Sequence, residues 1–315
     1  MRVLVSNLMM LKERPRFEAE IAARGWEPWF VDVDQYLSEE QCLELAGQFD
    51  GWLAGDDAIT RRVLEACLPR LRGISKWGTG IDSIDLDAAK ALGLPVRNSP
   101  GAFSEAVSEV ALGYMLILSR HLLEIDRQVH AGQWPKPMGL GLYGRTCGII
   151  GFGAIGQGIA RRAAGCGMIT LANDAMIAPG QSIHGTPLIT LEELLAQSDI
   201  VALACNLTRE NRHLINARRI AQMKPGALLI NVARGPVVDE AALVEALTCA
   251  RLGGAGLDVF EVEPLPMESP LRQFQNVVLG SHNANNLQSA VEAVHVNTMA
   301  NLAGILERGG QQFSN

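Results

Sequence analysis

The sequence predicts an α/β protein with two doubly wound parallel sheets. Short apolar runs alternate with amphipathic stretches along the first hundred residues, and the same alternation returns in the second half. This is the pattern of strands and helices that build a parallel sheet. Near the middle of the chain, a glycine-rich turn connects a strand-like run to a helical stretch. A length of 315 residues is also sufficient for two domains, each with its own core.

The first part of the chain predicts four strands separated by helical sequence. Residues 104–121 are apolar on nearly all sides, so we expect this helix to be buried at a domain or subunit interface. Residues 132–144 are rich in glycine and proline, which predicts a loop. Before them, the apolar runs predict a helix over 17–24 and strands at 3–5, 28–31, 51–54 and 73–76.

The second half predicts a further parallel sheet. Its last helix is too long to be a tail, and we expect it to pack back on another part of the protein. The predicted helices cover 157–167, 191–195, 217–223, 240–247 and 287–307, and the predicted strands cover 147–150, 168–173, 200–204, 227–231, 254–259 and 276–279.

The glycine-rich turn Gly151-Phe152-Gly153-Ala154-Ile155-Gly156 predicts a dinucleotide site. Gly151 permits the tight turn, Gly153 lets the backbone approach a pyrophosphate, and Gly156 lets the next helix pack close to the sheet. The phosphates then lie at a helix N-terminus, where free N–H groups favour anions. A tight turn that binds nothing is the alternative, and the preceding strand and following helix favour the binding site.

Asp174 follows the second predicted strand of this unit. A carboxylate at that position accepts hydrogen bonds from ribose hydroxyls and repels a 2′-phosphate. No Lys or Arg occurs at positions 175–178. The sequence therefore predicts NAD as the cofactor in preference to NADP.

Composition excludes several classes of partner. The net charge of −7 gives no attraction for nucleic acid or an anionic membrane. The longest apolar run, 110–118, is far shorter than the about 20 residues of a membrane span. The N-terminal residues also lack the pattern of a signal peptide, so we expect a cytoplasmic protein.

The six cysteines predict neither a metal site nor disulfides. They lie far apart, with no CxxC pair and no Cys/His spacing typical of a metal site. Most of them are within apolar segments. We expect them to be buried, reduced thiols.

Three residues with the chemistry of a ketone reductase follow three successive strands. Transfer of a hydride to a ketone requires a proton donor for the alkoxide and a cation for the substrate. Arg234, Glu263 and His282 stand at the carboxyl ends of the strands, where open α/β sheets bind their ligands. Taken singly, each has an ordinary structural explanation: a solvated arginine, a turn acid before Pro264, or a structural histidine.

Taken with their surroundings, these residues resemble the D-isomer-specific 2-hydroxyacid dehydrogenase family, which includes phosphoglycerate, glycerate and D-lactate dehydrogenases. The resemblance extends over nearly the whole chain, and its motifs occur in the family's order. Besides the glycine turn with Asp174, the most specific motifs are 78–85, 223–227, 231–240 and 256–264.

The resemblance implies a role for each of these catalytic residues. Arg234 matches the substrate-binding arginine, His282 the proton donor and acceptor, and Glu263 the acid paired with that histidine. A carboxylate beside an imidazole favours its protonated form, which can donate a proton to the alkoxide. We therefore expect the substrate to be a small 2-hydroxy or 2-keto acid.

The remaining site residues are also implied by the resemblance. Asp258 matches the aspartate that holds the nicotinamide carboxamide. Further substrate contacts are implied for the loop of Trp77, Gly78, Thr79 and Gly80, whose N–H groups receive the substrate carboxylate, and further cofactor contacts for Ala154, Ile155, Asn206 and Ala233.

The family resemblance also implies the domain arrangement. A flavodoxin-like substrate-binding domain would consist of residues 1–99 and 284–315, and a Rossmann NAD-binding domain of residues 100–283 would be inserted into it. The domains would close on the substrate and exclude water. The helix over 104–121 would contribute to a homodimer interface.

Two departures from the family pattern affect the expected site. Ser281 replaces the usual proline before His282, which leaves the direction of the histidine less defined. Asp56 and Asp57 stand where relatives that take 3-phosphoglycerate often have arginine, and two carboxylates repel phosphate unless a cation such as Lys76 reaches them. We therefore favour the general class over phosphoglycerate dehydrogenase proper, which stays the alternative.

Two other functions fit the same fold. One is a binding protein that senses NAD, and the other is an oxidoreductase acting on formate or phosphite. The presence of Arg234, Glu263 and His282 favours the enzyme over the sensor, and the Gly78 loop favours a 2-keto acid over formate.

Overall fold

The computed structural model describes residues 1–308 as two compact units. Of these residues, the first unit comprises 1–103 and 288–308, and the second comprises Ser104–Leu287. The second unit is thus an insertion in the sequence of the first. These bounds lie a few residues from those expected from the sequence.

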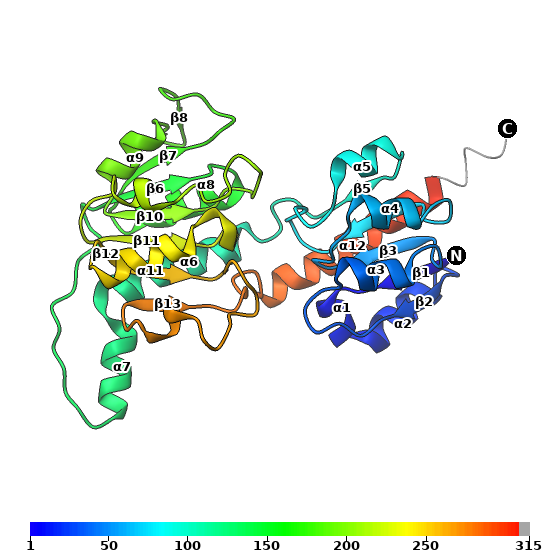
Figure 1. Cartoon of the computed structure of the whole chain (residues 1–315), viewed down its shortest axis with the longest axis horizontal. Coiled ribbons are helices and arrows are strands. Elements are labelled where there is room, and N and C mark those ends of the chain that lie inside the picture. The colour runs from blue at the N-terminus through cyan, green and yellow to red at the C-terminus, as the bar shows by residue number, and fades with distance from the viewer. Residues whose placement is uncertain (309–315) are drawn as a thin grey trace. The chain divides into compact units, whose positions relative to one another are not determined.

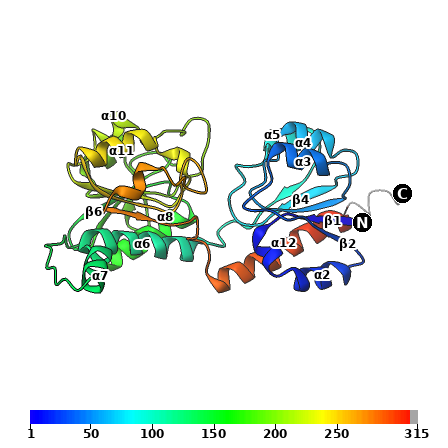
Figure 2. The same ribbon diagram turned by 60° about the horizontal axis from the view of Figure 1, so that its bottom comes forward.

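The first unit is a five-stranded parallel sheet in the order β2-β1-β3-β4-β5, which is the flavodoxin-like order (Figure 1). Figure 2 shows α3, α4 and α5 on one face of this sheet and α2 and α12 on the other. The strands are β1 (Arg2–Val5), β2 (Glu27–Phe30), β3 (Gly51–Ala54), β4 (Gly73–Lys76) and β5 (Val96–Arg97). The helices are α1 (Leu8–Lys12), α2 (Arg14–Ala22), α3 (Glu39–Leu45), α4 (Arg61–Ala66), α5 (Leu86–Ala91) and α12 (Gln288–Arg308).

The last helix, α12, packs on the first unit's sheet, as the sequence predicted. Ser75 of β4 donates a hydrogen bond to the Thr298 carbonyl at 2.8 Å. A Cβ added to Gly51 of β3 would lie 3.1 Å from the side chain of Leu302, so glycine lets the helix approach the strand closely. Helix α12 therefore belongs to the core of the first unit although it is far from it in sequence.

The second unit is a six-stranded parallel sheet in the order β13-β12-β11-β10-β6-β7. Its strands are β6 (Thr146–Ile150), β7 (Ile169–Asn173), β10 (Ile200–Leu203), β11 (Ala227–Asn231), β12 (Leu252–Leu257) and β13 (Val277–Leu279). Its helices are α6 (Ser104–Arg120), α7 (Leu122–His130), α8 (Ala154–Gly165), α9 (Leu191–Gln197), α10 (Ala217–Ile220) and α11 (Glu240–Thr248), with 3-10 turns at Gly235–Val237 and Pro270–Gln273 and a hairpin of β8 (Ser182–Ile183) and β9 (Thr186–Pro187).

The strand order of this unit changes direction between β6 and β10. The chain runs from β6 outward to β7 and returns to the other side of β6 as β10. Open α/β sheets bind ligands beside the carboxyl ends of the strands at such a point. The predicted fold of two doubly wound parallel sheets, one a Rossmann domain, is confirmed.

The helix predicted over 104–121 is present as α6, and its expected burial at a domain or subunit interface stays a prediction. Ala111, Tyr114 and Met115 of α6 are buried, whereas Leu116 is 37% exposed, so one face of the helix is covered within the chain and another is not. The helix ends where His121 adopts a left-handed backbone conformation with φ of 54°.

Within residues 1–308, no single helix is long and apolar enough to cross a membrane. Only the pair α6 and α7, bent by 64°, has sufficient length and apolar character when the two helices are taken together.

The prediction that the cysteines are buried holds for only some of them. All six are free, and Cys42, Cys67 and Cys147 are buried. Burial raises the pKa of Cys42 and of Cys147 to about 12, so both thiols stay protonated. Cys249 is exposed, contrary to the prediction, because it lies at the C-terminal end of α11.

The described residues contain no group of three or more His, Cys, Asp or Glu side chains that could hold a metal ion.

Candidate active site

The glycine turn joins β6 to α8 and has the geometry of a phosphate cradle. Gly151 has a φ of +89°, and a Cβ there would lie 2.5 Å from the backbone of Cys205 after β10, so only glycine fits. A Cβ at Gly153 would meet no atom within 4 Å, which leaves open space beside the N-terminus of the twelve-residue helix α8. Ala154 and Ile155 form the first turn of this helix. The turn therefore fits the pyrophosphate of a dinucleotide.

Asp174 follows β7 and contacts the same turn. Its Oδ2 accepts a hydrogen bond from the Phe152 N–H at 2.7 Å, and its Oδ1 accepts one from the Met176 N–H at 2.9 Å. Each carboxylate oxygen has two lone pairs, so both can still accept a hydrogen bond from a ribose hydroxyl. The sequence reasoning did not anticipate that Asp174 also holds the backbone of the glycine turn.

Asn206 and Ala233 follow β10 and β11, on either side of the sheet's midline. The Asn206 carbonyl accepts a hydrogen bond from the side-chain amide of Asn211, which closes the loop after β10. Ala233 is 6% exposed and donates its N–H to Asn231 Oδ1 at 3.1 Å. Both loops thus have a defined backbone at the carboxyl edge of the sheet.

Arg234 lies in the turn after β11. Its guanidinium donates a hydrogen bond to the Ala233 carbonyl at 2.9 Å, and its own carbonyl accepts one from the Asn231 side chain at 3.0 Å. Gly235 packs directly on the backbone of Phe260 and Glu261, where a Cβ would overlap. The turn that carries Arg234 is therefore held against the segment that carries Glu263.

His282 and Glu263 are in direct contact. The Nδ1 atom of His282 lies 2.7 Å from Oε2 of Glu263, and both side chains are about one-quarter exposed. Oε1 of Glu263 accepts a hydrogen bond from the Phe260 N–H at 2.9 Å. With Nδ1–H donating to the carboxylate, the Nε2 atom is the one that can exchange a proton with a bound molecule.

The direction of His282 is set by Asp258, which is 3% exposed. The carbonyl of Asp258 accepts the His282 N–H at 2.7 Å, and its carboxylate accepts the N–H groups of Asn283 at 3.1 Å and Ala284 at 3.0 Å. His282 has a φ of 54°, a strained conformation for a residue other than glycine. Asp258 therefore defines the direction of His282, although the usual proline before the histidine is replaced by Ser281.

Sequence reasoning missed the part of Tyr114 in this turn. Its hydroxyl lies 3.4 Å from Asp258 Oδ1, within the buried face of α6. Burial and the charge of Asp258 raise the pKa of Tyr114, so the hydroxyl remains a hydrogen-bond donor. In the sequence, Tyr114 is one of many residues of a largely apolar helix, and no local motif distinguishes it.

In the first unit, the loop over 77–80 follows β4. The N–H groups of Gly78, Thr79 and Gly80 donate no hydrogen bond in the part of the chain that the structure describes. Gly78 has a φ of +105°, which turns the backbone sharply. Three successive unused N–H groups form a suitable cradle for a carboxylate.

Trp77 differs from the other three residues of this loop. Its N–H donates to the Ala54 carbonyl at 2.9 Å, and its indole N–H donates to Nδ1 of His295 on α12 at 3.0 Å. The side chain is 5% exposed. Both N–H donors of Trp77 are therefore used inside the first unit, and its expected role in substrate binding stays a prediction.

The charge argument drawn from Asp56 and Asp57 also needs correction. Asp57 is fully buried and accepts hydrogen bonds from Ser6 Oγ at 2.5 Å and from the N–H groups of Leu37 and Gly55, both at 2.9 Å. Asp56 is paired at 2.8 Å with the ammonium of Lys76, which is itself 4% exposed. Only one carboxylate thus lies near the surface, and its charge is matched by a cation.

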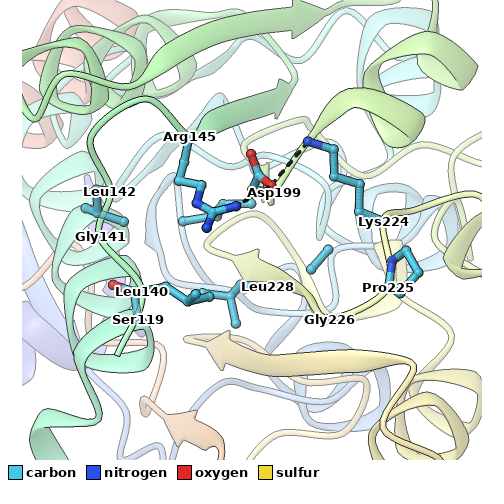
Figure 3. Close-up of a pocket in the computed structure, with 12 residues that line it drawn as sticks. Ser119, Leu140, Gly141, Leu142, Arg145, Asp199, Lys224, Pro225, Gly226 and Leu228 are labelled. Carbon is cyan, nitrogen blue, oxygen red and sulfur yellow. Dashed lines mark hydrogen bonds and ion pairs between the residues drawn. The ribbon is translucent and has the colours of Figure 1, made fainter. Parts of the chain in front are cut away.

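A cavity of about 280 Å³ in the second unit lies away from these groups. Arg145, Asp199 and Gly226 line it and immediately precede β6, β10 and β11, so the cavity is at the amino edge of the sheet (Figure 3). Figure 3 shows the Asp199 carboxylate between Arg145 and Lys224. Partial burial acts to raise the pKa of Asp199, but the Thr146 N–H and the two cations leave it below its usual value. We infer that this cluster of ion pairs has a structural role.

Comparison with known proteins identifies the family. The model of the D-isomer specific 2-hydroxyacid dehydrogenase, NAD binding domain, matches residues 112–284. A glyoxylate reductase of Thermococcus onnurineus (strain NA1) is 38% identical over 300 residues, which are 92% of this chain and 86% of the relative. A D-3-phosphoglycerate dehydrogenase of Synechocystis sp. is 37% identical over 277 residues, covering 87% of this chain and 49% of the relative.

A solved structure agrees over the full length. The D-lactate dehydrogenase of Aquifex aeolicus, complexed with NAD and lactic acid, has a TM-score of 0.87 at 27% identity and covers 99% of this chain and 97% of its own. The fold and the glycine turn define an NAD-dependent oxidoreductase. The chain belongs to the D-isomer specific 2-hydroxyacid dehydrogenase family, as the sequence motifs predicted.

Proposed function

We propose that the protein reduces a small unphosphorylated 2-keto acid to a D-2-hydroxy acid with NADH, and catalyses the reverse oxidation. The contact between His282 Nδ1 and Glu263 Oε2 at 2.7 Å carries this proposal. A carboxylate on Nδ1 favours the protonated imidazole, whose Nε2–H can be given to a ketone oxygen as negative charge develops on it. In the oxidation, the neutral imidazole takes the proton back from the hydroxyl.

The other site residues bind and orient. Bound NADH supplies the hydride, and the turn from Gly151 to Gly156 with Asp174 holds its phosphates and ribose. The guanidinium of Arg234 is a fixed fork of N–H donors suited to the carboxylate or carbonyl of a keto acid. The N–H groups of Gly78, Thr79 and Gly80 are free within their unit to receive the substrate carboxylate.

The surroundings of Lys76 support a substrate without a phosphate group. Its ammonium bonds the Trp77 carbonyl and Asp56, both at 2.8 Å, and it is almost completely buried. A substrate phosphate would have to replace Asp56 as its partner. The Thermococcus onnurineus relative, which matches most of both chains, is named glyoxylate reductase, and this name favours a small keto acid as the substrate.

We also propose that the protein is a homodimer through α6, α7 and the segment after them. Side chains of this region are apolar and exposed in the single chain, which is typical of a surface covered by another protein. Trp134, Met138 and Tyr143 are 79%, 94% and 86% exposed. Figure 1 shows α7 and this segment extending from the rest of the second unit. Light scattering coupled to size exclusion tests the dimer, and Met138→Glu with Tyr143→Glu should dissociate it.

The test of the enzymatic proposal is NADH oxidation, followed at the nicotinamide absorbance. Glyoxylate, hydroxypyruvate, pyruvate, oxaloacetate and 3-phosphohydroxypyruvate are compared, each also with NADPH. We expect turnover of a small unphosphorylated acid with NADH. Preference for the phosphorylated acid would identify a phosphoglycerate dehydrogenase. If none of the acids is reduced although NADH binds, the NAD-sensing binding protein would be favoured.

A further inference from the structure

The segment over 260–264 carries two glutamates, and each contacts a histidine from a different part of the second unit. Glu263 contacts His282, as described above. Two residues earlier, Oε1 of Glu261 lies 2.6 Å from Nε2 of His213. This second contact has the distance of an ion pair without the alignment of a hydrogen bond. It is an ion pair whenever His213 is protonated.

Glu261 is held from another side by helix α11. Its N–H donates to Oε2 of Glu240 at 2.9 Å, and its Oε1 accepts the N–H of Glu240 at 3.4 Å. Burial and the charge of Glu261 raise the pKa of Glu240. Each glutamate thus accepts the backbone N–H of the other, so the backbone at Glu261 is tied to the N-terminus of α11.

His213 in turn fixes the loop after β10 to the turn that carries Arg234. Its N–H donates to the Pro236 carbonyl at 2.8 Å. Its φ of 53° is a left-handed conformation that costs energy for a residue other than glycine, and it persists where surrounding contacts require it. His213 therefore joins the loop over 205–213, the turn over 234–238 and the segment over 260–264.

The segment over 260–264 is neither helix nor strand, so side chains fix its shape. The N–H of Phe260 donates to Glu263 and the N–H of Glu261 donates to Glu240. Loss of the anchor at Glu261 would free the segment to move, and the carboxylate of Glu263 would move with it. A shift of about 1 Å in a positioned group can cost on the order of a hundredfold in rate.

We propose that His213 and Glu261 are a positioning pair that holds the Glu263 carboxylate against Nδ1 of His282. The inference rests on the proposed function, in which Glu263 and His282 act in proton transfer. Neither member of the pair contacts a reacting group. Their effect passes through the segment over 260–264.

The test measures keto acid reduction by His213→Gln and Glu261→Gln, alone and with Glu263→Gln. We expect His213→Gln to lower kcat/KM about tenfold, the size of a typical coupling between neighbouring residues, and to change the Kd of NADH less than about twofold. Glu261→Gln should act alike, and the double variant should be no worse than either. With Glu263→Gln present, His213→Gln should cost less than about twofold, because the group that it positions is already lost.

His184→Gln is the control, since His184 also has a left-handed backbone and is exposed between β8 and β9, away from the residues assigned to the site and to the proposed dimer surface. It should retain full activity. If the loss caused by His213→Gln persists in the Glu263→Gln background, the pair acts through general stability and the inference is overturned. It is equally overturned if His213→Gln costs nothing while Glu263→Gln abolishes turnover. Full activity of Glu263→Gln itself would instead contradict the proposed function.

Discussion

Asp258 and His282 are joined by the hydrogen bond from the His282 N–H to the Asp258 carbonyl, 2.7 Å long. The carboxylate of the same aspartate accepts the next two N–H groups of the chain. One buried residue thus holds three successive residues, His282 through its carbonyl and the next two through its carboxylate, and it does so where His282 has a φ of 54°. Asp258 therefore fixes the direction in which the proposed proton donor points.

Replacement of His282 tests its role directly. His282→Ala should lower reduction by a factor of about 10² to 10⁴, which is the usual contribution of a general acid. NADH should still bind, because the glycine turn and Asp174 are unchanged. Turnover with NADH and a keto acid, beside NADH binding by fluorescence, measures both. His130→Ala, at a largely exposed histidine on α7, is the control, and near-full turnover of His282→Ala would refute the proton donor.

Replacement of Asp258 should affect both stability and activity. Asp258→Asn puts an amide N–H where the carboxylate accepts the N–H of Asn283 or Ala284, leaving a buried donor unsatisfied. This costs about 1–3 kcal/mol of the free energy of unfolding. The freed turn should also lower kcat. Thermal unfolding and kinetics measure the two effects, and Tyr114→Phe, which removes only the 3.4 Å contact, should cost less. Equal effects of the two variants would speak against the anchoring role.

Asp174 should determine the choice of cofactor. Asp174→Asn removes the charge that repels a 2′-phosphate and keeps an oxygen for one of its two backbone hydrogen bonds. We expect the KM for NADH to rise about tenfold and the preference for NADH over NADPH to fall by a similar factor, since a hydrogen bond to a charged group contributes about 1.5–3 kcal/mol. Kinetics with both cofactors provide the measurement. An unchanged preference would remove Asp174 from the cofactor site.

The sequence was sufficient for the parts of the site that depend on short motifs. The turn from Gly151 to Gly156 has local geometry that only glycine permits, and Arg234, Glu263 and His282 follow strands that periodicity identifies. It was insufficient where contacts are distant in sequence. The Asp57 carboxylate is buried by Ser6 and Leu37, and no pattern near residue 57 predicts that. The family resemblance assigns Trp77 to the substrate loop, and no nearby pattern indicates that its side chain bonds His295, more than 200 residues away.

His295 should make the stability of the first unit depend on pH. It is 1% exposed, and its Nδ1 accepts the indole N–H of Trp77, which requires a neutral ring. Burial lowers its pKa from 6.5, although Glu13, Glu20 and Glu292 act against this and Arg16 with it. The folded protein thus binds fewer protons here than the unfolded chain.

His295 therefore makes its full contribution to the free energy of unfolding above pH 6.5, the ordinary pKa of a histidine. This contribution decreases as the pH falls below that value. His295→Asn keeps an acceptor for Trp77 and cannot be protonated, so its free energy of unfolding should fall less between pH 7.5 and pH 5.5. Denaturant unfolding followed by tryptophan fluorescence measures this, since Trp26, Trp29, Trp52 and Trp77 all lie in the first unit. The other histidines are common to both proteins, so their titration cancels in the comparison. If the free energies of unfolding of the two proteins depend on pH in the same way, His295 becomes protonated in the folded protein without loss of stability.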